Sequence, residues 1–222
     1  MELKEAVKQR HSVRQYLDKK LPDETVEKLK AEVAACNAGG YNIQLVTNEP
    51  KAFVNFFAHY GKFENVSNYI ALVGKKGEGL HENLGYLGER LAIYAQSLGL
   101  NTCWVALSFS RRKAQITVNE GEKLLCVIAL GYGKTQGVRH KNKPVEKFYE
   151  AKADDPEWFK AGIEGALCAP TAINQQKFFI ERSGNEVKIS ATGGGKLGLI
   201  DLGIVKYDFE TCAGKENFVW KE

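Results

Sequence analysis

Four residues near the start of the chain have the chemistry to bind an anion. Arg10, His11, Ser12 and Arg14 lie within one short segment and supply two guanidinium groups, an imidazole and a hydroxyl. Guanidinium groups bind phosphate through charge-assisted hydrogen bonds, and a hydroxyl adds a further donor. The alternative to an anion site is that these residues form a solvated helix end that binds no ligand. Because Arg-x-Ser-x-Arg occurs only here, the sequence predicts one phosphate-sized anion site per chain.

The composition indicates a folded chain with a mild positive charge. Its 222 residues are 44% hydrophobic and carry a formal net charge of +4. This suits one large domain, or two small ones that share a core, and an anionic ligand. We expect no nucleic-acid partner, because the basic segments lack interleaved aromatic residues and a helix-turn-helix pattern. The charged N-terminus and the lack of a long apolar run predict neither a signal peptide nor a membrane span.

The cysteines indicate packing rather than chemistry. The chain has five cysteines and four histidines, without Cys-x-x-Cys or a metal-ligand spacing. Each cysteine lies among apolar or small residues, as buried thiols do. We therefore expect reduced thiols, a cytoplasmic location and no metal.

Apolar periodicity predicts alternating helices and strands. The clearest helix spans residues 81–98 and ends at Gly99, and another spans residues 22–38, beginning at Pro22. Further helices are predicted at 2–10, 52–60, 110–113, 157–168 and 198–211. Strands are predicted at 43–47, 68–74, 124–131, 177–182, 186–190 and 218–220, and residues 103–107 form a short apolar segment. The glycines at 193–195 lack the Lys-Ser/Thr that follows a phosphate loop, so they indicate a flexible turn.

Part of the chain is repeated. When Cys36 is aligned with Cys168, the motif Asn-x-Gln at residues 42–44 falls on the same motif at residues 174–176. Both copies read helix, tight turn, Asn-x-Gln and strand. The period exceeds roughly 100 residues, far longer than a solenoid repeat, so it predicts a duplicated domain, although chance similarity is the alternative.

Two further matches set the extent of the repeat. Residues 83–85 resemble residues 201–203, and residues 103–105 resemble residues 218–220. We therefore divide the chain into a first half, residues 1–150, and a shorter second half, residues 151–222.

The two halves differ in their polar residues. The second half contains Pro170 and Thr171 in its turn, where the first half has glycine and tyrosine at residues 39–41. The second half, in contrast, lacks Arg-x-Ser-x-Arg. Each half has thus kept one of two features, which predicts one ligand for the whole chain.

The chain resembles the FMN-dependent nitroreductase family, specifically its single-chain, duplicated members. The resemblance rests on residues 10–14, 85–99, 101–104, 128–133 and 169–176 in this order, and it covers nearly the whole chain. It implies an α+β fold of mixed, mostly antiparallel sheets flanked by helices, in which the two halves form an internal pseudo-dimer.

The resemblance also implies an FMN held between the halves. It places at the phosphate Arg10, His11, Ser12 and either Arg139 or Lys141. It places Arg14 at the ribityl chain or the pyrimidine edge of the flavin. The other edge of the ring is implied to contact Pro170, Thr171, Ala172 and Asn174. The backbone N–H groups implied near flavin N5 are those of Trp104, Val105 and Ala106.

The implied reaction is hydride transfer from NAD(P)H through FMN to a nitroaromatic, a quinone or a similar conjugated acceptor. The alternative is a flavin-binding carrier or sensor without turnover. No Ser/His/Asp or Cys/His arrangement is convincing, so the flavin itself is expected to carry the chemistry. The chain is expected to be a monomer, because duplication supplies the two-subunit interface, or a homodimer.

Overall fold

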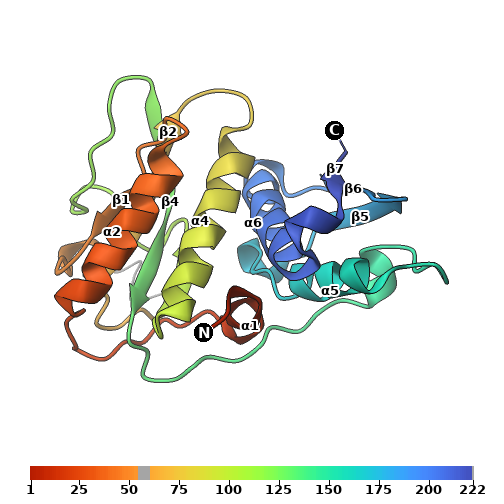
Figure 1. The fold of residues 1–222 in the computed structure, drawn as a ribbon. Coiled ribbons are helices and arrows are strands. Elements are labelled where there is room, and N and C mark those ends of the chain that lie inside the picture. Colours follow the sequence, from red (N-terminus) through yellow and green to blue (C-terminus); the bar gives the residue numbers. More distant parts are fainter. Residues whose placement is uncertain (55–60, 222) are drawn as a thin grey trace. The chain divides into compact units, whose positions relative to one another are not determined.

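The computed structural model describes residues 1–54 and 61–221. They form two compact units that are interleaved along the chain (Figure 1). Unit 1 comprises Met1 with residues 10–80 and 91–138, and unit 2 comprises residues 2–9, 81–90 and 139–222. The division into halves 1–150 and 151–222 concerns the sequence repeat, and it stays a prediction.

Unit 1 is built on a four-stranded antiparallel sheet with the order β1-β2-β4-β3. The strands are β1 (Gln44–Val46), β2 (Asn68–Lys75), β3 (Asn101–Val105) and β4 (Glu122–Gly131). In β2, Tyr69, Ala71 and Val73 belong to the core on one face of the sheet. Because side chains alternate along a strand, the equally buried Ile70 and Leu72 face the opposite side. Both faces are therefore covered, as the continuous apolar run predicts.

The helix α2 (Asp23–Asn37) lies against β1 (Figure 1). It buries Leu29, Val33 and Cys36, which share one face at helical spacing. The Asn37 side chain closes the turn into the sheet, because it donates to Ile43 O and accepts from Ile43 N, both at 2.8 Å. The predicted helix and the strand that follows it are confirmed here.

Two segments of unit 1 that were predicted as helices differ from the prediction in the structure. The helix predicted near residues 110–113 is wrong, because these residues form only one turn, in which Ala114 N donates to Ser110 O at 3.0 Å. The Arg111 guanidinium donates instead to the carbonyls of Leu124 (2.9 Å) and Leu125 (3.0 Å). For the helix predicted at 52–60, the structure has the 3₁₀ helix η1 (Lys51–Phe53), and residues 55–60 lie outside the described residues.

Unit 2 combines a three-stranded sheet with helices. The sheet has the order β5-β6-β7, with an antiparallel β5–β6 pair and a parallel β6–β7 pair. Its strands are β5 (Phe178–Ser183), β6 (Glu186–Ala191) and β7 (Val219–Trp220). The helices are α1 (Leu3–Gln9), α5 (Glu157–Ala166) and α6 (Gly195–Ala213), with short 3₁₀ turns η2 (Val145–Lys147), η3 (Ala172–Asn174) and η4 (Lys215–Asn217). The two long helices α5 and α6 pack together (Figure 1).

The helix α6 begins at Gly195, before the predicted residue 198. Gly194 and Gly195 have φ angles of 88° and 56°, and Gly198 N donates to Gly194 O at 3.1 Å. Of the three glycines predicted as a flexible turn, Gly193 and Gly194 precede the helix and Gly195 is its first residue. These glycines form the entry into α6, because the left-handed backbone there favours residues without a Cβ.

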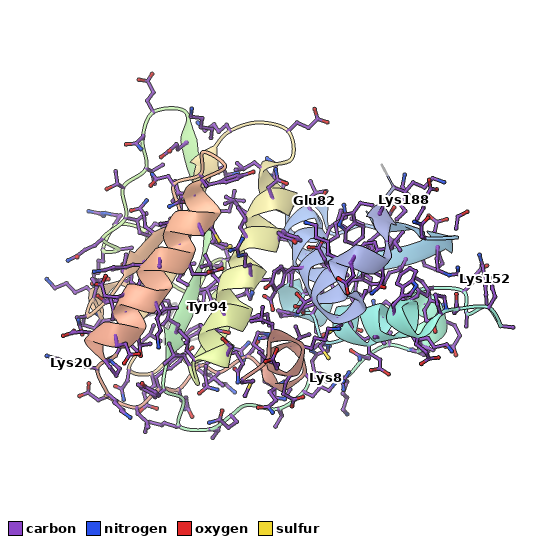
Figure 2. The ribbon with its side chains drawn as sticks, viewed as in Figure 1. Lys8, Lys20, Glu82, Tyr94, Lys152 and Lys188 are labelled. Carbon is purple, nitrogen blue, oxygen red and sulfur yellow. The ribbon has the colours of Figure 1, made fainter. Side chains whose placement is uncertain are left out.

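Two glycines bring residues 81–90 of α4 (Leu80–Ser97) against α6. A Cβ on Gly85 would overlap the carbonyl of Ile200, and a Cβ on Gly203 would overlap the carbonyl of Glu82. Lys206 of α6 forms an ion pair with Glu82, which is labelled in Figure 2. The contact is reciprocal, since each glycine meets the residue one turn before the other glycine.

We predict that Gly203→Ala lowers the free energy of unfolding by about 1–3 kcal/mol, because the new methyl group must push the two helix backbones apart. Alanine's higher helix propensity, worth about 1 kcal/mol, would by itself act in the opposite direction. Urea unfolding followed by circular dichroism measures the change. Gly77→Ala is the control, because no atom lies within 4 Å of its added Cβ. Equal midpoints for the two variants would contradict the close approach.

Candidate functional site

In unit 1, the predicted anion-binding segment lies along the free edge of β3. Ser12 forms a parallel bridge with Thr102, and Val13 N donates to Thr102 O at 3.0 Å. Arg10 is buried, with 2% exposed, whereas Arg14 is exposed. Backbone pairing with an edge strand therefore holds this segment extended.

The loop after β4 packs on the same segment. Gly137 has a φ of 72°, and a Cβ there would lie 2.9 Å from the Cβ of His11. Asn101 fixes this loop, because it accepts from Gly133 N and donates to Gln136, both at 2.9 Å. Gly137 was not among the predicted residues, and Asn101 was noted only within the resembling segment 101–104, because no local pattern links either residue to these contacts.

Cys103 lies next to the predicted anion-binding residues. Burial raises the pKa of its thiol, while the nearby charges of Arg14 and Arg10 and a hydrogen bond with Ser12 act in the opposite direction. The two predicted arginines and Ser12 therefore all influence one buried thiol. The sequence assigned Cys103 to packing, and all five cysteines are buried and lie outside any disulfide.

The predicted segment Trp104–Ala106 begins on the same strand. Trp104 and Val105 pair with Ile128 and Val127 of β4, and Ala106 follows the strand directly. Val105 is buried, while Trp104 and Ala106 are half-buried. The structure thus brings this segment and residues 10–14 to one strand. The role of its N–H groups toward a flavin stays a prediction.

In unit 2, the predicted turn has a strained backbone. Ile173, Asn174 and Gln176 have φ angles of 48°, 55° and 46°. The left-handed region is unfavourable for a residue with a branched Cβ, at a cost of about 1–3 kcal/mol. Ile173 is also 98% exposed, so burial of its side chain does not offset this cost. Strain of this kind is common at functional sites.

Asp201 of α6 maintains the turn. Its carboxylate accepts from Ala172 N at 3.0 Å and from Gln175 Nε2 at 2.6 Å. Thr171 contributes from within the turn, because its hydroxyl accepts from Gln176 N at 3.1 Å. Burial raises the pKa of Asp201, and the two hydrogen bonds act against this rise. Asp201 was noticed only as a match to Asn83 in the repeat, so its contact with the turn was missed.

The turn also binds the predicted basic segment. Lys141 O accepts from Asn174 Nδ2 at 3.0 Å and from Gln176 Nε2 at 2.8 Å. Lys143 N donates to Gln176 Oε1 at 3.0 Å. We call the side chains of Asn174 and Gln176 the second Asn-Gln clamp. It joins two segments that the sequence analysis assigned separately to the cofactor.

Unit 1 contains the same arrangement, the first Asn-Gln clamp. Thr117 O accepts from Asn42 Nδ2 at 3.2 Å and from Gln44 Nε2 at 2.7 Å, and Thr117 N donates to Gln44 Oε1 at 2.9 Å. In both clamps the glutamine also donates to the asparagine side chain, at 3.2 Å in the first and 2.7 Å in the second. The residues aligned in the sequence repeat therefore make equivalent hydrogen bonds.

The predicted cofactor residues divide between the two units. Unit 1 contains Arg10, His11, Ser12, Arg14, Trp104, Val105 and Ala106. Unit 2 contains Arg139, Lys141, Pro170, Thr171, Ala172 and Asn174. Within unit 1 the residues gather along β3, and within unit 2 they gather at the turn and its clamped segment.

Two kinds of feature are absent from residues 1–54 and 61–221. No group of three or more histidine, cysteine, aspartate or glutamate residues could hold a metal ion there. None of the helices in this part of the chain combines the length and hydropathy needed to cross a bilayer.

Comparison with known proteins establishes the family. The family described as “Putative TM nitroreductase” matches residues 2–213, and the chain therefore belongs to this nitroreductase family. No curated protein matches the chain significantly.

Solved structures show the same fold. A “putative nitroreductase” of Thermotoga maritima is 22% identical with a TM-score of 0.67, and the match covers 97% of this chain and 85% of that one. A “putative nitroreductase” of Desulfovibrio desulfuricans, in complex with FMN, is 18% identical with a TM-score of 0.52, covering 69% and 96%. A nitroreductase family protein of Streptococcus pneumoniae is 15% identical with a TM-score of 0.53, covering 67% and 98%. The predicted α+β, nitroreductase-like fold is confirmed.

We predict that Ile173→Asn raises the free energy of unfolding by about 1 kcal/mol, because asparagine tolerates the left-handed backbone that isoleucine does not. Val138→Asn is the matched control, since Val138 is also strongly exposed, at 85%, without a positive φ. The control should change stability by less than about 0.5 kcal/mol. Urea unfolding of both variants measures the difference, and equal shifts would show that strain at Ile173 contributes nothing.

Proposed function

We propose that the chain is an FMN-dependent oxidoreductase that transfers hydride from NAD(P)H to a nitroaromatic, a quinone or a similar conjugated acceptor. The observation that carries the proposal is the hydrogen-bonded pairing of the turn at residues 170–176 with the basic segment at residues 139–143. Membership of a nitroreductase family supports the reaction class. The FMN complex of the Desulfovibrio relative supports the cofactor.

The cationic side chains suit the charge of FMN. Arg14, Arg139 and Lys141 are exposed, and within the described part of the chain none of them forms an ion pair with a carboxylate. A phosphate monoester carries about two negative charges near neutral pH. Cations without carboxylate partners retain their full attraction for such an anion. The residues present therefore fit FMN.

Each segment has a proposed role toward the cofactor. Arg10, His11 and Ser12 bind the phosphate, together with Arg139 or Lys141. Arg14 provides positive charge at the ribityl chain or the pyrimidine edge. The other edge of the ring is lined by Pro170, Thr171, Ala172 and Asn174, and flavin N5 faces the backbone N–H groups of Trp104, Val105 and Ala106.

Bound FMN supplies the two-electron chemistry, and the protein supplies binding, orientation and electrostatics. The strained turn gives a physical basis for orientation, because Asp201 and the second Asn-Gln clamp hold its backbone in one conformation. We further propose that NAD(P)H and the acceptor use the same open face in succession. The buried cysteines, none of them in a disulfide, fit the reducing, cytoplasmic setting that we propose for the protein.

We also propose that the chain is an internal pseudo-dimer of the duplicated halves. The two Asn-Gln clamps support this, and so does the reciprocal crossing of Gly85 and Gly203. In a two-fold symmetric interface, residue i contacts residue j and j contacts i. Gly85 contacts Ile200, and the repeat partners of these residues, Gly203 and Glu82, also contact each other. A chain of this kind can act as a monomer or as a homodimer.

We predict that Arg14→Ala raises the dissociation constant for FMN by about 10-fold or more, because it removes a cation that faces the cofactor, a loss of about 1.5–3 kcal/mol. Quenching of flavin fluorescence on titration measures this affinity. Arg112→Ala is the control, because it removes an equally exposed arginine from the same unit. Equal effects of the two substitutions would contradict the assigned role.

We predict that the FMN-loaded protein oxidises NAD(P)H when a quinone or nitroaromatic acceptor is present. The assay follows nicotinamide absorbance with and without the acceptor. FMN binding without NAD(P)H consumption would instead identify a flavin carrier or sensor. A preparation that is colourless and does not quench added FMN would overturn both the enzyme and the carrier.

A further inference from the structure

We propose that Gln176 is a positioning residue that fixes the basic segment at residues 139–143 for the phosphate of the cofactor, and thereby sets the preference for FMN over riboflavin. This inference rests on the proposed function. It adds a role for a residue that is not itself expected to contact the flavin.

The Gln176 side chain is fully engaged. It is buried, with 5% exposed. A side-chain amide has two N–H donors and one carbonyl acceptor, and here the donors reach Lys141 O and Asn174 Oδ1 while the carbonyl accepts from Lys143 N. A rotation of this side chain would break all three hydrogen bonds. Its own backbone is held in turn by Thr171.

The segment that Gln176 holds is irregular, and Asn174 binds it as well. Residues 139–143 belong to no helix or strand, and Arg139 and Lys141 are exposed. Fixing the backbone of one residue costs about 1–2 kcal/mol of conformational entropy. A segment that is ordered before the ligand arrives does not lose this entropy on binding. The clamp therefore strengthens an interaction that Arg139 or Lys141 makes with an anion.

The two Asn-Gln clamps differ in the charge of the segments that they hold. Gln44 binds the backbone O and N of the single residue Thr117, whereas Gln176 binds Lys141 O and Lys143 N. Residues 115–119 contain no lysine or arginine. Residues 139–143 contain Arg139, Lys141 and Lys143. The duplicated device is therefore present in both units, while the cations occur only on the segment beside the Pro-Thr turn. A purely structural clamp would not require that difference.

Lys143 differs from Arg139 and Lys141 in the contact that its side chain makes. Its ammonium group donates to Gln175 O, back toward the turn. Within the described ranges, Arg139 and Lys141 form no such contact through their side chains. The clamp and Lys143 thus hold the backbone, and the charges of Arg139 and Lys141 are left for a ligand.

The test compares Gln176→Ala with Gln44→Ala, which removes the same hydrogen bonds in unit 1. Dissociation constants for FMN and for riboflavin are measured by fluorescence quenching. Gln176→Ala should raise the constant for FMN by about 10-fold and that for riboflavin by less than about 3-fold. Gln44→Ala should leave the ratio of the two constants unchanged. A Gln176→Ala protein that loses both ligands equally, or neither, would overturn the inference.

A double-mutant cycle keeps the test decisive if Gln176→Ala perturbs folding. The charge-only variant Arg139→Ala/Lys141→Ala leaves the clamp intact and should reproduce the selective loss of FMN affinity. Adding Gln176→Ala to it should cause little further selective loss, since residues that act through one another are not additive. Additive selective losses would overturn the positioning role. Wild-type protein that binds neither flavin would overturn the proposed function as well.

Discussion

The left-handed backbone at Ile173, Asn174 and Gln176 is the constraint on which the candidate site of unit 2 depends. This conformation persists because Asp201 accepts hydrogen bonds from Ala172 and Gln175. The second Asn-Gln clamp also ties the turn to Lys141. Asp201 lies within reach because α6 starts early, through glycines with positive φ. The clamp in turn carries the basic segment. The unfavourable backbone of the turn at residues 170–176 is therefore in contact with α6 on one side and with the basic segment at residues 139–143 on the other.

The two Asn-Gln clamps are a structural device that occurs in both units. Both units use the same amide hydrogen bonds to hold an irregular segment, but they hold different residues. Unit 2 presents cations beside a Pro-Thr turn, and unit 1 presents the Arg-x-Ser-x-Arg segment along β3. The two units thus share a structural device but differ in the polar groups that accompany it.

Much of the fold could be predicted because its signals are local. The buried strands β2 and β4 follow from continuous apolar runs, and α4 follows from leucines at helical spacing. The helix near residues 110–113 failed because Arg111 binds carbonyls of β4, a partner that local spacing does not reveal. At the site, residue types identified the segments around Arg10 and Pro170. Asp201, Gly137 and the strain at Ile173 depend on contacts between distant segments, and no local pattern predicts them.

The number of flavins per chain tests the central claim most directly. Protein saturated with FMN is freed of excess ligand by gel filtration and denatured, and the released FMN is compared with the protein concentration from amino-acid analysis. The account predicts one FMN per chain, because each half supplies only one part of the binding set. Two FMN molecules per chain would contradict it, since the turn with Gly39-Gly40-Tyr41 would then form a second working site.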